Sequence, residues 1–139
     1  MPWRTMDAMA KVSIHEVRRL VLPIETVVDA VLLFDRERAG ALAHAAVVEA
    51  KVASGDDAGL VLSVRIAGSE AIEQRKFALP ALAAAIIHYC WIARIPLPRQ
   101  GAKKLEVVPE GFAFTIESTL QLPRRHDPAP VLRRDAAIA

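Results

Sequence analysis

The chain has 139 residues, which is enough for one ordinary hydrophobic core and too few for two, so we expect a single domain. A hydrophobic fraction of 53% and a charged fraction of 24% exclude an intrinsically disordered chain. The net charge of +2 arises from 18 basic and 16 acidic residues mixed along the sequence, which gives little support to a polyanion partner. The abundance of Ala and Arg and the lack of Asn indicate a GC-rich bacterial source.

The two ends of the chain differ in composition from its middle. Residues 1–12 show no clear hydrophobic period, and residues 123–139 carry three prolines and four arginines with few side chains that could pack. We therefore predict mobile tails at 1–12 and 123–139 around a domain at 13–122. The single Cys90 cannot form an internal disulfide and the start lacks a secretory signal, so the predicted location is cytoplasmic.

An internal repeat organises the predicted domain. The segment Glu16–Pro23 aligns with Glu73–Pro80 at an offset of 57 residues, with four of eight positions identical. A helix-length apolar run follows each proline, and proline is well tolerated in a first helical turn. These signals predict helices at 24–38 and 80–94.

A hairpin follows each predicted helix. Leu60–Arg65 and Phe112–Glu117 each follow a glycine and alternate apolar residues with small or polar ones, as half-buried strands do. Turn-forming residues at 54–59 and 109–111 precede these strands, so each reads as the second half of a hairpin. The order β-α-β-β thus occurs twice, at about 14–66 and 71–122, although chance similarity in an Ala- and Val-rich chain is the alternative.

The repeat predicts an α+β fold with two layers. Its mostly antiparallel strands should form one sheet with both helices on one face. The core residues expected beneath the helices are Leu60, Leu62, Val64, Phe112, Phe114 and Ile116.

The second predicted helix is apolar nearly all round. Pro80 and Pro96 limit it to about 15 residues, or roughly 22 Å, against the roughly 30 Å of a bilayer core, so a buried helix is favoured over a membrane span. One sheet covers only one side of a helix, so a partner subunit is the natural cover for the other side. We therefore predict a homodimer in which Ile87 and Trp91 are shielded; the alternatives are cover by the first helix or by the C-terminal tail.

Catalytic and metal-binding patterns are weak in this sequence. His88 and Cys90 are two positions apart on a helix, so their side chains diverge, and the apolar surroundings favour a structural role for the thiol. Glu25 and Asp29 share a helix face, where acidic residues in a first turn usually complement the helix dipole. The four histidines have no metal-site spacing, and no phosphate loop or nucleophile motif is present. We predict no catalytic residue, no metal and no cofactor.

Basic residues surround the predicted loop after the second helix. Arg94, Arg99, Lys103 and Lys104 could grip an anion or an acidic partner if their side chains converge. The alternative is that they are ordinary solvated strand and helix ends.

These observations favour a small non-enzymatic bacterial binding or protein-interaction module that acts as a homodimer. A nucleic-acid-binding accessory protein that uses the basic loop is the first alternative, although only 5% of the residues are aromatic and no stacking platform is evident. An enzyme of unrecognised type is the second alternative. A continuous positive stripe would favour nucleic acid, and a pocket with convergent titratable groups would favour an enzyme.

Overall fold

The computed structural model describes residues 12–121, so the predicted tails, apart from residue 12, lie outside the described residues. Six strands and two α-helices follow one another in the order β-α-β-β, β-α-β-β, with two short 3₁₀ helices in the first half. The elements are β1 (Ser13–Pro23), α2 (Ile24–Glu37), η1 (Ala41–His44), β2 (Ala45–Ala53), η2 (Gly55–Asp57), β3 (Gly59–Ile66), β4 (Ile72–Ala78), α3 (Leu79–Ile92), β5 (Ala102–Val108) and β6 (Gly111–Gln121).

The strands form two three-stranded antiparallel sheets, with orders β1-β6-β5 and β2-β3-β4. The α+β class with antiparallel strands is therefore confirmed, but the expected single sheet is divided in two. Each sheet combines the hairpin of one half with the first strand of the other half, because β1 pairs with β6 and β4 pairs with β3. The first strand of each half thus crosses over to the other half of the chain.

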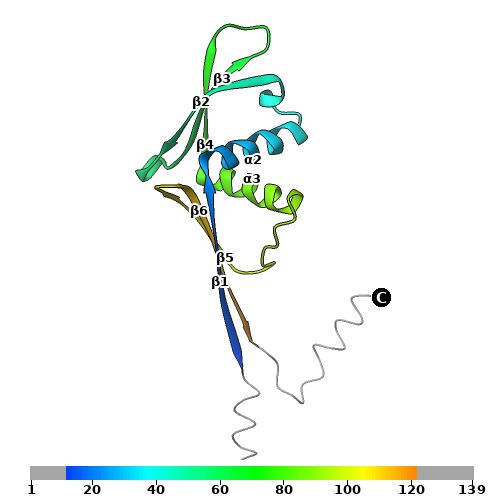
Figure 1. Ribbon diagram of the computed structural model, residues 1–139, viewed down its shortest axis with the longest axis vertical. Helices are drawn as coiled ribbons and strands as arrows, with labels where there is room; N and C mark the ends of the chain where they lie inside the picture. The colour runs from blue at the N-terminus through cyan, green and yellow to red at the C-terminus, as the bar shows by residue number, and fades with distance from the viewer. Residues whose placement is uncertain (1–11, 122–139) are drawn as a thin grey trace, which may run out of the picture.

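The two helices run side by side in the same direction, on one side of the sheets (Figure 1). Each begins directly after a strand, with Pro23 as the N-cap of α2 and Pro80 inside the first turn of α3. Neither of these 14-residue helices in the described part of the chain is long and apolar enough to cross a membrane.

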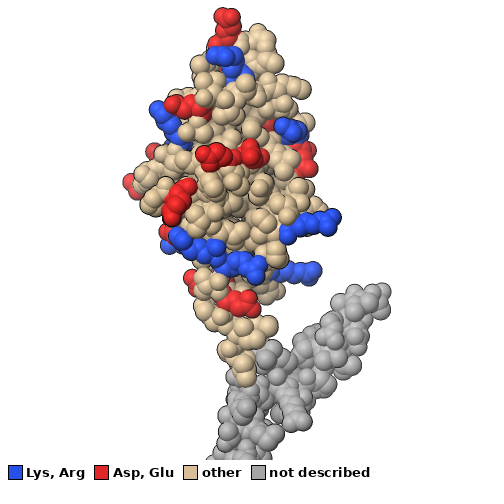
Figure 2. Space-filling model, in the orientation of Figure 1, with Lys and Arg blue, Asp and Glu red and all other residues tan. Residues whose placement is uncertain are grey.

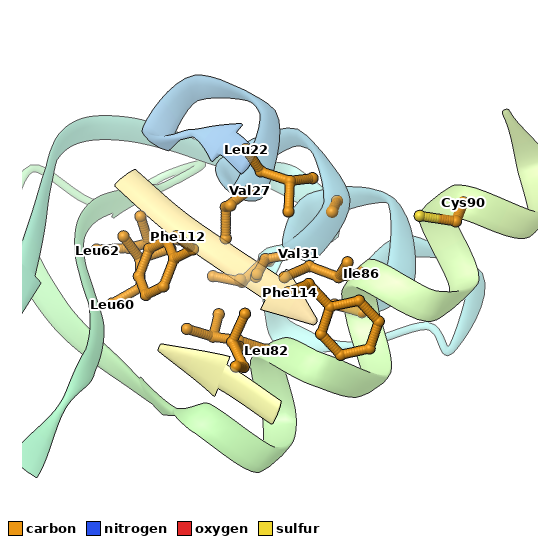
Figure 3. Packing of buried hydrophobic residues seen from close by; sticks show 14 of the residues in the cluster. Leu22, Val27, Val31, Leu60, Leu62, Leu82, Ile86, Cys90, Phe112 and Phe114 are labelled. Carbon is orange, nitrogen blue, oxygen red and sulfur yellow. The ribbon is translucent and has the colours of Figure 1, made fainter. Parts of the chain in front are cut away.

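The core lies between the helices and the sheets (Figure 3). All six residues predicted to line it are fully buried, which confirms that the alternating patterns in β3 and β6 were assigned to the correct face. Side chains from both helices and both sheets belong to one buried cluster, which joins the two halves of the chain. The helical members of this cluster are Val27, Ala30, Val31, Leu82, Ala85, Ile86 and Cys90.

Positions 55 residues apart in the sequence are structurally equivalent in the two helices. The helices begin at Ile24 and Leu79, and the buried positions 27, 30 and 31 of α2 correspond to 82, 85 and 86 of α3. This agreement is consistent with the predicted tandem repeat. The structural correspondence differs by two residues from the sequence alignment at 57, because Pro23 precedes its helix whereas Pro80 lies within its helix.

Both helices also end in the same way. Ala39 and Arg94 have left-handed backbones, with φ of 54° and 60°. The amide of the residue after each donates to a carbonyl five residues back, Gly40 N–H to Asp35 O at 2.9 Å and Ile95 N–H to Cys90 O at 2.8 Å. This is a Schellman-type C-terminus, and in both helices a non-glycine residue occupies the position where glycine is usual.

Two glycines mark equivalent close approaches of the backbone in the two sheets. A Cβ on Gly59 would lie 2.2 Å from the carbonyl oxygen of Phe77, and one on Gly111 would lie 2.4 Å from that of Leu22. Phe77 and Leu22 are themselves 55 residues apart. Because these glycines have no side chain, the backbone of the first strand of one half can approach the hairpin of the other half closely.

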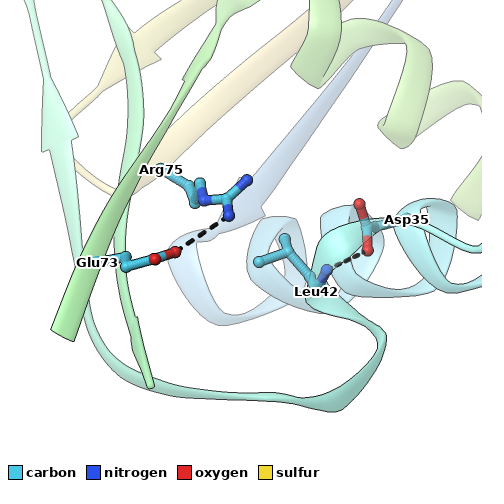
Figure 4. A network of polar contacts seen from close by, with 4 residues as sticks. All are labelled: Asp35, Leu42, Glu73 and Arg75. Carbon is cyan, nitrogen blue, oxygen red and sulfur yellow. Dashed lines mark hydrogen bonds and ion pairs between the residues drawn. The ribbon is translucent and has the colours of Figure 1, made fainter. Parts of the chain in front are cut away.

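Figure 4 shows two local polar contacts, one between α2 and η1 and one within β4. The backbone N–H of Leu42 donates to Asp35 Oδ2 at 2.8 Å, which ties η1 to the end of α2. Arg75 Nη2 donates to Glu73 Oε2 at 3.1 Å, and these two residues lie two apart on β4 and hence on one face.

An arm of two strands projects from the sheet that contains β1 (Figure 1). The pairing of β5 with β6 ends at Ala102 and Glu117, whereas β1 and β6 continue to the pair of Ser13 and Gln121. We define the arm as residues 13–17 and 117–121. Over most of its length the arm is two strands wide, and within the part of the chain that the structure describes no third strand pairs with it.

Candidate functional site

A groove of about 780 Å³ lies along the outer side of α3 and the loop that follows it. We refer to it as the α3 groove. Its walls are mostly apolar, with two arginines, and a volume of this size is in the range of ligand and peptide sites. Its lining residues are Ala84, Ile87, His88, Cys90, Trp91, Arg94, Ile95, Pro96, Leu97 and Arg99.

Trp91 is the most exposed large apolar residue of the described chain, with 79% of its surface accessible. Ile92 beside it is 47% exposed, and Ile87 is half-buried in the groove wall. The sequence predicted an apolar outer face on this helix around Ile87 and Trp91, and the exposed face of α3 agrees with it. The predicted cover by a second subunit stays a prediction.

The equivalent face of α2 provides an internal comparison. The exposed residues of α2 include four that are charged, and the residues 55 positions later in α3 are also exposed but apolar. The same helical scaffold therefore carries an ordinary solvated face in the first half of the chain and an apolar face in the second. The corresponding pairs are Glu25 and Pro80, Asp29 and Ala84, Arg36 and Trp91, and Glu37 and Ile92.

His88 connects the two helices near their C-terminal ends. Its Nε2 contacts the Glu37 carboxylate, and its ring packs edge-on against Phe34 with a centroid distance of 5.4 Å. Its Nδ1 is buried and has no hydrogen-bond partner in the described part of the chain. This arrangement holds the imidazole against α2 and away from Cys90, so His88 acts as a link between helices.

Cys90 is fully buried at the end of the core cluster, where Figure 3 shows it beyond the Phe114 ring. Burial raises the pKa of its thiol, because the thiolate would be poorly solvated there. A thiol in these surroundings is a poor nucleophile. The structure thus supports the structural role expected from its apolar neighbours.

The four predicted anion-contact residues divide into separate locations. Arg94 and Arg99 both line the α3 groove. Lys103 and Lys104 are successive residues of β5, so their side chains point to opposite faces of the sheet. Lys104 Nζ lies 3.8 Å from the Glu106 carboxylate, on the face away from the core. The two arginines are therefore brought to one site, and the two lysines are not.

Basic side chains nevertheless form a visible band across the molecule near the level of the α3–β5 loop (Figure 2). Arg18 lies on the core-facing side of β1, where its guanidinium donates to the carbonyl oxygen of Pro96. This bond fixes the loop against β1. Local sequence patterns do not reveal this contact, because it joins segments that are far apart in the chain.

A second hollow, of about 490 Å³, lies between the loop and the arm. Glu16 and Arg18 come from β1, Leu97 and Arg99 from the loop, and Leu120 from β6. Leu97 and Arg99 also line the α3 groove, so the loop separates two neighbouring depressions. The apolar residues Leu97 and Leu120 were not singled out from the sequence, since their exposure depends on which strands and loops lie beside them.

Among residues 12–121 no group of three His, Cys, Asp or Glu side chains could hold a metal ion. Comparison with known proteins adds no assignment: no family model, no curated protein and no solved structure matches the chain.

Proposed function

We propose that the protein is a non-enzymatic interaction module that forms a homodimer through the apolar face of α3. The observation that carries this proposal is the difference between two equivalent helix faces. Where α2 exposes Arg36 and Glu37, α3 exposes Trp91 and Ile92. A solvated helix face is normally polar, so apolar residues at these positions favour contact with another molecule.

The chemistry of the face also suits a protein interface. Tryptophan and arginine are the residue types that dominate interface energetics, and here Trp91 lies in one groove with Arg94 and Arg99. A two-fold homodimer is the commonest closed assembly, and it would cover the same patch on both copies.

Light scattering of the full chain at micromolar concentration tests the proposal. We expect a dimeric mass for the wild type and a monomeric mass for Trp91→Glu, with unchanged circular dichroism because the side chain is exposed. The matched control is Arg36→Glu, which places the same residue at the equivalent position of α2 and should remain dimeric. A monomeric wild-type protein, or a dimer that survives Trp91→Glu, would show that this face is not the interface.

The two alternative functions have less support. Nucleic acid binding through the basic loop would need a convergent set of cations, whereas Lys103 and Lys104 point to opposite faces and Lys104 lies close to Glu106. An enzyme would need a group able to act as a nucleophile or base at the groove. The two nearest groups are a buried Cys90 and a His88 that is engaged with Glu37.

A further inference from the structure

The arm carries an apolar face that neither helix of residues 12–121 covers. Ile14 and Leu120 are directly paired across the two strands and are 37% and 57% exposed. They lie on the face that buries Leu22 and Phe112 further along the same strands, because alternate residues of a strand share a face. A two-stranded ribbon is marginally stable alone in water, so this face gains from a partner.

The charges of the arm and the α3 groove are opposite. Residues 13–17 and 117–121 contain no Lys or Arg. Glu16 lies on the same arm face as Ile14 and Leu120, whereas Glu117 lies on the opposite face, with its Oε2 3.9 Å from His15 Nε2. The described residues that line the groove include Arg94 and Arg99 and no acidic residue. On the face drawn in Figure 2, the narrow end of the molecule shows acidic and uncharged atoms directly below the basic band. The arm face of Ile14 and Leu120 thus combines apolar side chains with the acidic Glu16, and the groove combines apolar side chains with two arginines.

The arm cannot reach the groove of its own chain. β1 and β6 run without a register shift from the core to the end of the arm, so the arm is a direct continuation of the sheet. It points away from the helices and the body of the molecule (Figure 1). A second copy can present its arm to this groove, and one arm and one groove per chain are the requirements of a closed two-fold contact.

We infer that each arm docks in the α3 groove of a second copy, so that the dimer is a reciprocal clasp. In this contact Ile14 and Leu120 pack against Trp91 of the partner subunit. Glu16, on the same arm face, faces the partner's Arg94. This inference rests on the proposed homodimer, and it identifies the arm as the element that covers the apolar face of α3 in that dimer.

The apolar part of the contact is tested by the double variant Ile14→Ser and Leu120→Ser in the full chain. Loss of two buried aliphatic side chains from each of two contacts should raise the dimer dissociation constant by about 100-fold or more, as measured by sedimentation equilibrium. The matched control is Val48→Ser, an exposed apolar residue on β2 of the other sheet, which should leave the constant unchanged. An unchanged constant in the double variant would overturn the clasp.

The charged part is tested by reversal and rescue. Glu16→Arg should weaken the dimer by about tenfold or more, because it places like charges together, and adding Arg94→Glu in the same chain should restore it. Arg94 suits this test because it lines only the groove, whereas Arg99 also lines the hollow that contains Glu16 of its own chain. Failure of the second substitution to restore the dimer would contradict the assigned pairing.

Cross-linking keeps the inference falsifiable if an arm variant loses its fold. Two chains lacking Cys90, one with Leu120→Cys and one with Ala84→Cys, should form a mixed disulfide, whereas Val48→Cys with Ala84→Cys should not. A dimer that Trp91→Glu dissociates, but in which the arm forms no cross-link and tolerates substitution, would refute the clasp and leave the proposed dimer intact. A monomeric wild type would refute both.

Discussion

Replacing Ala39 by glycine should stabilise the protein. Ala39 ends α2 with a φ of 54°, and a left-handed backbone costs an L-residue about 1–2 kcal/mol that glycine avoids. Glycine loses about 0.5–1 kcal/mol more conformational entropy on folding than alanine, which offsets part of this gain. The net stabilisation is about 0.5–1 kcal/mol, or about 2–5 °C in Tm for a domain of this size.

Differential scanning calorimetry at a fixed protein concentration measures this shift. Ala39 suits the test better than Arg94, because Arg94 has the same backbone conformation but also lines the α3 groove. Two comparisons give the opposite sign: Ala39→Val should lower Tm, since a β-branched residue is poorly tolerated at positive φ, and Ala81→Gly should lower Tm within regular helix. A Tm for Ala39→Gly at or below the wild-type value would refute the left-handed helix terminus.

Two further predictions concern the crossing strands and the thiol. Gly59→Ala and Gly111→Ala should each lower the free energy of unfolding in urea by about 2–4 kcal/mol, because the new Cβ meets a backbone oxygen. Gly68→Ala, at an open turn, should lower it by only about 1–2 kcal/mol. Equal losses of stability in all three variants would contradict this account. Cys90 should react slowly with a thiol reagent in the native protein and rapidly after denaturation, and fast native labelling would exclude its burial. Because burial raises the pKa of this thiol, the unfolded chain ionises first, so stability should fall as the pH rises above about 8.5, by at most about 1.4 kcal/mol per pH unit, until the thiol of the folded protein also ionises. Cys90→Ala should remove that slope.

Local signals in the sequence were sufficient for the elements themselves. Proline at the helix starts and apolar runs of helical length placed α2 and α3 within one or two residues of their ends. Alternation in β3 and β6 identified the buried face, because a strand turns successive side chains to opposite sides whichever strands pair with it.

Pairing between strands was beyond local reasoning. A first strand that joins its own hairpin buries the same alternate residues as one that joins the other hairpin, so the pattern in β1 is compatible with both. The alignment of the two repeats was also ambiguous, because proline is tolerated both before a helix and in its first turn. The sequence alignment that matches Pro23 with Pro80 therefore differs by two residues from the structural alignment of the helices.

For the candidate site, the sequence identified the outer face of α3 and the two arginines of the groove. The lysine pair could have been separated from the arginines by strand alternation once a strand was assigned to 102–108. Ile14 and Leu120 could not have been found in this way. Their exposure arises because the helices of the described chain cover the sheet only further along, at Leu22 and Phe112, and nothing in the sequence of β1 or β6 specifies where that cover ends.

The exchange of first strands between the two halves has a consequence for how the chain folds. The sheet that contains β1 is completed by β6, the last strand of the described chain, so its pairing has the longest loop to close. During synthesis on a ribosome, the sheet that contains β1 can form only after almost the entire domain has been made, although β1 and α2 are made first. The other sheet consists of the consecutive strands β2, β3 and β4, so it can form first. The helix α3 and the strands β5 and β6 can then pack against a sheet that is already formed.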